Sequence, residues 1–148
     1  KSLFIRDGRL DVETVLKRFS ALMYAEYREE NGDFLERHAG LLFLCFLKPI
    51  INGTGHYVVE PETRGGRRMD IIVFYGSEEH IIELKIWRGE KYEEKGIEQL
   101  AHYLNYRGQK KGYLLSFCDN QTSPREGKTI TYNDSEIVEV IIAYRDKE

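Results

Sequence analysis

Two apolar segments separated by a short turn constrain the fold more than any other feature of this sequence. MDIIVFY (69–75) and HIIELKIW (80–87) are typical of strands, and GSEE between them is typical of a tight turn. Both faces of the two strands are largely apolar, so we expect them to be central in a sheet that is covered on two sides. The sequence therefore predicts an α/β domain in which helices pack against a mixed sheet.

Helical and strand patterns continue on both sides of this pair. Asp11 can act as N-cap of a first helix that fades near Tyr27, and a second helix runs from Asp33 to an end marked by Pro49 and Asn52-Gly53. The second helix is apolar almost all round after Ala39, so we expect it to be buried on most sides. The other expected elements are a small hairpin within 1–10, a strand over 56–62, a helix over 92–107, a strand over 112–118 with parallel neighbours, and a closing hairpin over 129–133 and 136–144.

Length and composition limit the classes of protein to which the chain can belong. It has 148 residues, of which 41% are hydrophobic and 32% are charged, and this suits one domain with a core. No apolar run approaches the ~18 residues of a membrane span, and the first residues lack the apolar region of a signal peptide. We therefore expect a cytoplasmic protein without membrane contact. Because the chain begins with Lys1, we also expect it to be part of a longer protein.

The cysteines and the net charge exclude two further classes. Cys45 and Cys118 lie far apart in apolar runs, which excludes a disulfide scaffold or a multi-cysteine zinc site and predicts two buried free thiols. The net charge of −3, from 22 Lys and Arg against 25 Asp and Glu, argues against a globally basic nucleic-acid binder. Residues 64–111 are net positive, with 10 Lys and Arg against 8 Asp and Glu, so a polyanion could still bind locally.

Charged residues inside the two central strands are the most informative chemical feature. Asp70 precedes an apolar run, and Glu83 and Lys85 interrupt another. If 76–79 form the turn with Gly76 facing Glu79, then Asp70 faces Lys85, and all three charged side chains share one face. Two carboxylates so placed can bind one hard divalent cation, and the lysine can assist hydrolysis of a phosphodiester. The alternative is a structural charge cluster that holds no metal.

These residues resemble a known group of nucleases. Asp70 and Glu83-Leu84-Lys85 on a hairpin, behind a helix that bears Glu36, resemble the PD-(D/E)xK nuclease superfamily, although Met69 stands where its signature has proline. Gln99 and Tyr103 on the next helix resemble the Q-x-x-x-Y motif of its RecB-like branch. The match covers roughly residues 33–118. This segment of the chain also looks like the nuclease-like domain at the C-terminus of many bacterial AAA-type ATPase-like proteins.

The resemblance implies a fold, a cofactor and partners. The fold would be a restriction-endonuclease-like α-β-β-β-α-β core in residues 33–148, to which a C-terminal hairpin and an N-terminal extension with a helix (1–32) are added. The cofactor would be Mg²⁺ or Mn²⁺, the substrate DNA, and the neighbour in the full-length protein an ATPase-like domain. Asp70, Glu83 and Glu36 would bind the metal, Lys85 would be the catalytic lysine, Gln99 would support the catalytic site, and Tyr103 would contact nucleic acid.

Several of these residues also have simpler interpretations. Glu36 is placed for a capping box with Asp33, and Gln99 and Tyr103 are four residues apart on a helix, where packing alone explains them. Glu60, on the preceding strand, could point toward the same site or lie on the surface at the sheet edge. A glycine-broken turn carries Arg64, Arg67 and Arg68, which could bind nucleic-acid phosphates or be solvated.

Two functions follow from the sequence. The first is a Mg²⁺-dependent nuclease that acts on DNA, which the set of Asp70, Glu83 and Lys85 favours. The second is a catalytically degenerate nuclease fold that serves as a nucleic-acid or protein interaction module of an ATPase-like protein, which the acidic net charge favours.

Overall fold

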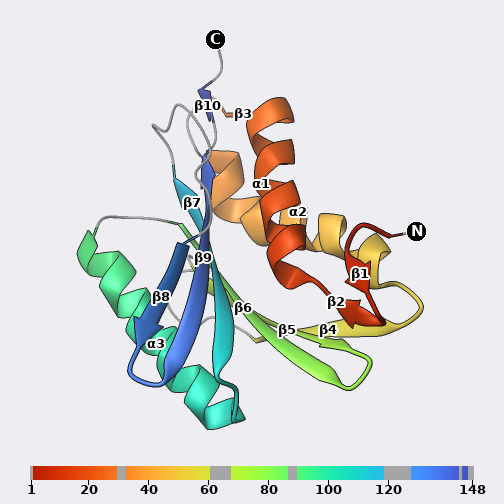
Figure 1. Ribbon diagram of the computed structural model, residues 1–148. Helices are drawn as coiled ribbons and strands as arrows, with labels where there is room; N and C mark the ends of the chain where they lie inside the picture. Colours follow the sequence, from red (N-terminus) through yellow and green to blue (C-terminus); the bar gives the residue numbers. More distant parts are fainter. Residues whose placement is uncertain are drawn as a thin grey trace.

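The computed structural model describes residues 2–29, 33–60, 68–86, 90–118, 128–143 and 145–146, without the side chains of 28–29, 33–37, 90–93 and 145–146. Three helices and a six-stranded mixed sheet make up most of it (Figure 1). The helices are α1 (Val12–Glu26), α2 (Asp33–Ile51) and α3 (Glu90–Arg107). The sheet strands are β4 (Gly55–Glu60), β5 (Arg68–Tyr75), β6 (Glu78–Ile86), β7 (Lys111–Cys118), β8 (Lys128–Tyr132) and β9 (Ser135–Ala143).

The order of strands in the sheet is β4-β5-β6-β7-β9-β8. β4, β5 and β6 are antiparallel neighbours, β7 is parallel to both β6 and β9, and β8 pairs antiparallel with β9. The expected α/β class, mixed sheet and closing hairpin are therefore confirmed, and β5 and β6 are both interior strands, although β5 lies next to the edge strand β4. Two small additions are the hairpin of β1 (Ile5–Arg6) and β2 (Arg9–Leu10), and the parallel pair of β3 (Arg28–Glu29) with β10 (Arg145–Asp146).

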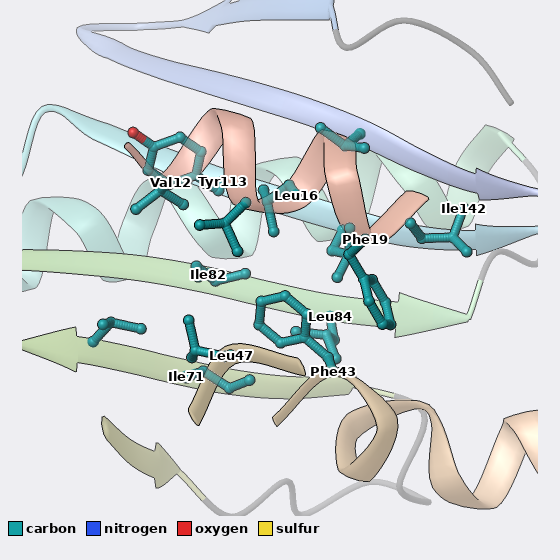
Figure 2. Close-up of a cluster of buried hydrophobic side chains, with 14 of the residues drawn as sticks. Val12, Leu16, Phe19, Phe43, Leu47, Ile71, Ile82, Leu84, Tyr113 and Ile142 are labelled. Atoms are coloured by element: carbon teal, nitrogen blue, oxygen red, sulfur yellow. The ribbon is translucent and has the colours of Figure 1, made fainter. Parts of the chain in front are cut away.

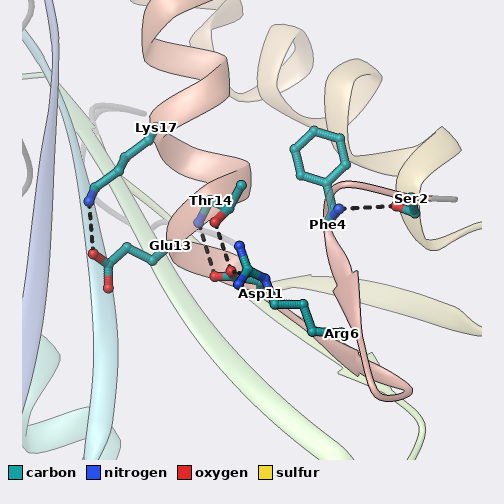
Figure 3. Close-up of polar contacts among 7 residues, drawn as sticks. All are labelled: Ser2, Phe4, Arg6, Asp11, Glu13, Thr14 and Lys17. Atoms are coloured by element: carbon teal, nitrogen blue, oxygen red, sulfur yellow. Dashed lines mark hydrogen bonds and ion pairs between the residues drawn. The ribbon is translucent and has the colours of Figure 1, made fainter.

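The helix α1 begins where the sequence predicts, because Asp11 caps it. The carboxylate of Asp11 accepts hydrogen bonds from the backbone N–H and the hydroxyl of Thr14, at 3.1 and 2.7 Å (Figure 3). Arg6 of the small hairpin pairs with the same carboxylate at 3.2 Å. Side-chain acceptors of this kind satisfy backbone donors that the first turn leaves unpaired. The N-terminal hairpin is thereby tied to the start of α1.

One face of the sheet packs against α1 and α2, and the other packs against α3 (Figure 1). Phe19 of α1 lies at the centre of the first interface, with Phe43 of α2 5.2 Å away and Phe117 of β7 6.3 Å away between ring centroids. Figure 2 shows how side chains from both helices and the strands fill this layer. The N-terminal helix thus shares a core with residues 33–148. No helix in the described part of the chain is long and apolar enough to span a membrane.

The second helix differs from expectation in the burial of one stripe. Ala39, Phe43 and Leu47 face the core, but Leu41 is 59% exposed and Cys45 is also exposed. The prediction that Cys45 is buried is therefore wrong, whereas Cys118 is buried as expected. The other hydrophobic side chains after Ala39 are buried or pack against the core, so the prediction that α2 is buried on most sides is confirmed. Leu41 and Cys45 are four residues apart on one stripe of the helix, and nothing in the sequence distinguishes this stripe from the apolar residues that pack. The helix ends at Ile51, directly before Asn52-Gly53 as predicted, and Pro49 lies in its last turn.

The register of the central hairpin is shifted by two residues from the predicted one. Tyr75 pairs with Glu78, so Gly76 and Ser77 form a two-residue loop, and Gly76 has a φ of +60°. Such loops favour glycine at a central position with positive φ, whereas the prediction placed this glycine at the start of the turn. Asp70 consequently faces Glu83 rather than Lys85. Because the shift is even, each side chain stays on its predicted face of the sheet.

Candidate metal and phosphate site

Three carboxylates form a row across three neighbouring strands. Glu60 of β4 pairs with Asp70 of β5, which pairs with Glu83 of β6. Directly opposite residues of antiparallel strands point to the same face, with Cβ atoms about 4.5–5.5 Å apart. This face carries Ile81 and Leu114, which pack against α3. We refer to Glu60, Asp70 and Glu83 as the carboxylate row.

Two positively charged side chains lie on the same strands, each two residues from a member of the carboxylate row. Arg68 pairs with Lys85 across β5 and β6, on the face that carries the carboxylate row. The Arg68 guanidinium donates two hydrogen bonds to Glu83, from Nε to Oε2 at 2.9 Å and from Nη2 to Oε1 at 2.7 Å. Its Nη1 donates to the side-chain oxygen of Gln99 on α3. Arg68, which the sequence suggested as a phosphate ligand, is therefore bound to the predicted metal ligand.

One stripe of α3 covers these charged side chains. Gly96, Gln99 and Tyr103 follow one another at steps of three and four residues, which places them on one helical face. Gln99 contacts Arg68, and the Tyr103 hydroxyl lies 3.4 Å from Oε1 of Glu60. The structure thus brings both predicted helix residues to the site. Arg107 continues the stripe and binds Glu79 of β6 through two hydrogen bonds of 2.8 Å.

Gly96 allows the helix to pass close to Lys85. A Cβ atom at this position would lie 2.9 Å from Nζ of Lys85 and 3.5 Å from Oε2 of Glu83. The side chain of Lys85 is almost entirely buried, at 1% exposure, and Glu83 is at 0%. A buried ammonium next to a buried carboxylate is costly to assemble, and larger residues at position 96 would displace it.

A second buried carboxylate, which the sequence patterns did not indicate, lies on the same face. Glu139 of β9 is fully buried; Ser116 donates to its Oε2 at 3.2 Å, and Nζ of Lys128 lies 3.6 Å from its Oε1. Through Leu114 of β7 it continues the carboxylate row in register. The signal that could have found Glu139 is the one that found Glu83, a charge inside an apolar strand.

Burial dominates the acidity of Glu83. Removal from water raises the pKa of this carboxyl to about 7, because the charged form loses solvation. The hydrogen bonds and positive charge of Arg68 act in the opposite direction, while the charge of Asp70 raises the pKa further. Burial and the nearby carboxylate of Glu60 similarly raise the pKa of the Tyr103 hydroxyl. The ionised form of Glu83 therefore depends on the cations beside it.

This pKa predicts a pH-dependent stability of the metal-free protein. The unfolded state loses the Glu83 proton near the ordinary pKa of 4.5, and the folded state loses it near 7, so the folded state binds more protons between these values. The free energy of unfolding should then fall as pH rises from 4.5 through 7, by on the order of 3 kcal/mol from this group. Urea unfolding in chelator should show this fall in the wild type, and Glu83→Gln should lack it. His80, whose pKa burial lowers, is present in both proteins and cancels from the comparison. Parallel curves for the two proteins would contradict the prediction.

Some predicted site residues lie outside the described structure. Arg64 and Arg67 belong to the segment 61–67, and Glu36 lies in α2 but its side chain is not described. Within the described residues, no group of three or more His, Cys, Asp or Glu side chains is close enough to hold a metal ion. A cavity of about 340 Å³ lies along a neighbouring stripe of α3, where Glu98 and His102 line it together with Tyr132 of β8.

The donor set of the carboxylate row suits a hard divalent cation. Asp70 and Glu83 offer carboxylate oxygens from opposed positions, which is the chemistry that Mg²⁺ and Mn²⁺ select. Both oxygens of Glu83 already accept hydrogen bonds from Arg68. A cation at Glu83 would therefore lie beside this guanidinium, whose positive charge opposes its binding.

Comparisons with protein-family models, curated proteins and solved structures give no match to this chain. Its relation to the PD-(D/E)xK nucleases stays a prediction that rests on its own residues.

Proposed function

We propose that this chain is a divalent-metal-dependent nuclease that hydrolyses phosphodiester bonds of DNA. The observation that carries the proposal is the placement of Asp70 opposite Glu83, with Lys85 two residues further along the same face. A core-like sheet face carries buried charges only where they are paired or used, because each unpaired one costs several kcal/mol. In this proposal the chain is the nuclease domain of a longer ATPase-like protein.

Each residue has a distinct role in the proposed reaction. Asp70 and Glu83 would hold the cation, with Glu60 beside them as a further carboxylate. When bound, the cation would stabilise charge on the phosphate and lower the pKa of a water molecule. Lys85 is positioned by Gly96 and Glu83, and its ammonium would donate hydrogen bonds to a phosphate oxygen as negative charge develops there. Gln99 contacts Arg68 and Tyr103 contacts Glu60, so α3 would help to position both of these side chains.

One observation favours the second function, a degenerate nuclease fold that binds a partner without catalysis. Arg68 neutralises Glu83 through two hydrogen bonds, so the charge cluster is compensated without any metal. A cleavage assay separates the two functions. Linear, branched and single-stranded DNA are incubated with the protein and Mg²⁺ or Mn²⁺, and activity that depends on metal and on Lys85 supports the nuclease. DNA binding without cleavage of any substrate supports the interaction module.

Substitution of Asp70 by asparagine should remove metal binding without unfolding the protein. The charge of Asp70 acts repulsively on Glu83, so its loss should leave the melting temperature unchanged or higher in chelator. Mn²⁺ should raise the melting temperature of the wild type, because a ligand that binds only the folded state stabilises it, and should not raise that of Asp70→Asn. Equal shifts in the two proteins would place the metal elsewhere.

Substitution of Gly96 by alanine should separate catalysis from stability. The added Cβ would displace the ammonium of Lys85, and misplacement of a catalytic group by about 1 Å costs up to ~100-fold in rate. Alanine in a helix interior is favoured over glycine by about 1 kcal/mol, so the fold should tolerate the change. Single-turnover cleavage rates and urea unfolding measure the two effects, with Lys95→Ala at an exposed neighbouring position as control. An unchanged rate would show that Lys85 is not used.

A further inference from the structure

The Arg68 side chain is accessible from outside the site, whereas its partner is not. The side chain of Arg68 is 18% exposed and that of Glu83 is 0% exposed. The exposed part of this pair therefore belongs to Arg68, so a phosphate of an approaching nucleic acid meets the Arg68 side chain before it meets the carboxylate. Guanidinium groups bind phosphate and carboxylate oxygens with the same pair of parallel hydrogen bonds, so one can replace the other.

We propose that Arg68 is a latch on Glu83 that a backbone phosphate of the nucleic acid releases, so that substrate binding and metal binding are coupled. This inference rests on the proposed function and adds regulation to the same site. In the free protein Arg68 occupies both oxygens of Glu83, and a divalent cation binds weakly. When a phosphate takes the guanidinium, the Glu83 carboxylate is left without its bidentate partner and becomes available to the cation.

The physical basis is an exchange of partners in a buried site. An ionised carboxylate with no exposed surface needs a positive charge beside it, and in the free protein Arg68 supplies that charge. Once Arg68 has turned to a phosphate, Glu83 and Asp70 would hold a metal ion, which would supply the positive charge in its place. Coupling of two binding events is reciprocal, so the metal must increase affinity for nucleic acid by the same factor as the nucleic acid increases affinity for the metal.

The test is calorimetric titration of Mn²⁺ into the protein alone and with a phosphorothioate DNA duplex, whose linkages resist hydrolysis. The duplex should increase the Mn²⁺ affinity of the wild type by roughly 10-fold or more, the range expected when hydrogen bonds to a charged group are released. Arg68→Gln should bind Mn²⁺ tightly without the duplex and gain little from it. Arg68→Lys, which keeps the charge but loses the paired geometry, should be intermediate.

Arg107→Gln is the matched control. Like Arg68, Arg107 donates two hydrogen bonds to a glutamate of β6, but this arginine lies on α3 and its partner Glu79 is outside the carboxylate row. It should bind Mn²⁺ as the wild type does. If Arg68→Gln does not fold, the Nε–H signal of Arg68 in NMR spectra of the wild type still decides, since the duplex should shift it. If the duplex does not change the Mn²⁺ affinity of the wild type, and Arg68→Gln binds Mn²⁺ no more tightly than the wild type, the latch is overturned and the proposed function is not. Absence of Mn²⁺ binding in every protein and condition would overturn the proposed function with it.

Discussion

Replacement of Lys85 by alanine should slow DNA cleavage by a factor on the order of 10² to 10³, which is the effect of losing one preorganised electrostatic group. The ammonium is buried beside Glu83 where α3 passes close to it at Gly96, so it needs little reorganisation when charge develops on a phosphate. The measurement is the single-turnover rate at saturating Mg²⁺. Lys85→Met, which keeps the apolar stem and removes only the charge, should show the same loss.

DNA affinity should change much less in these variants than the rate. We expect Arg64 and Arg67 to contact nucleic-acid phosphates, so Arg64→Gln and Arg67→Gln should weaken binding in a salt-dependent manner. A circular dichroism melt checks that each Lys85 variant is folded. If Lys85→Ala cleaves as fast as the wild type under metal saturation, the activity resides elsewhere and the interaction module becomes the better function.

Replacement of Phe19 by alanine should lower the free energy of unfolding by about 3–5 kcal/mol, the cost of removing a large buried aromatic side chain. Phe19 is 2% exposed and contacts Phe43 and Phe46 of α2 and Phe117 of β7, so its loss opens a cavity among three elements. Small domains have only about 5–15 kcal/mol of total stability, so this is a large fraction of it. Urea unfolding followed by circular dichroism measures the change.

The Phe19 variant also tests whether the N-terminal helix belongs to the same cooperative unit as residues 33–148. Leu22→Ala, on the exposed side of α1 at 46% exposure, is the matched control and should cost less than 1 kcal/mol. A single transition shifted to lower urea is expected for Phe19→Ala. A separate early transition of α1, with the rest of the protein unchanged, would show that residues 1–32 fold as an independent extension.

The order of helices and strands could be read from the sequence because it depends on local patterns. The segments 69–75 and 80–87 are apolar on both faces, and in the fold they are the interior strands β5 and β6, with helices on both sides. Asp11 caps α1 because its carboxylate is three residues from the backbone N–H it accepts, which is a relation within one turn of chain. Alternation along each strand, together with the predicted turn, places Asp70, Glu83 and Lys85 on one face, and a register error of two residues leaves that result unchanged.

Three features could be known only from the tertiary structure: the partners of the charged side chains, the exposed side of α2 and the close approach of α3. Each of them depends on contacts between residues far apart in the chain. Nothing near Arg68 in the sequence indicates that its guanidinium binds Glu83 and Gln99, since the pairing requires the hairpin register and the position of α3 together. The exposure of Cys45 follows from which side of α2 meets the sheet, and the role of Gly96 follows from how closely α3 crosses Lys85. Alternation along a strand fixes the face of each side chain. The partner of each charge on that face is set by packing, because neighbouring strands and a covering helix supply it.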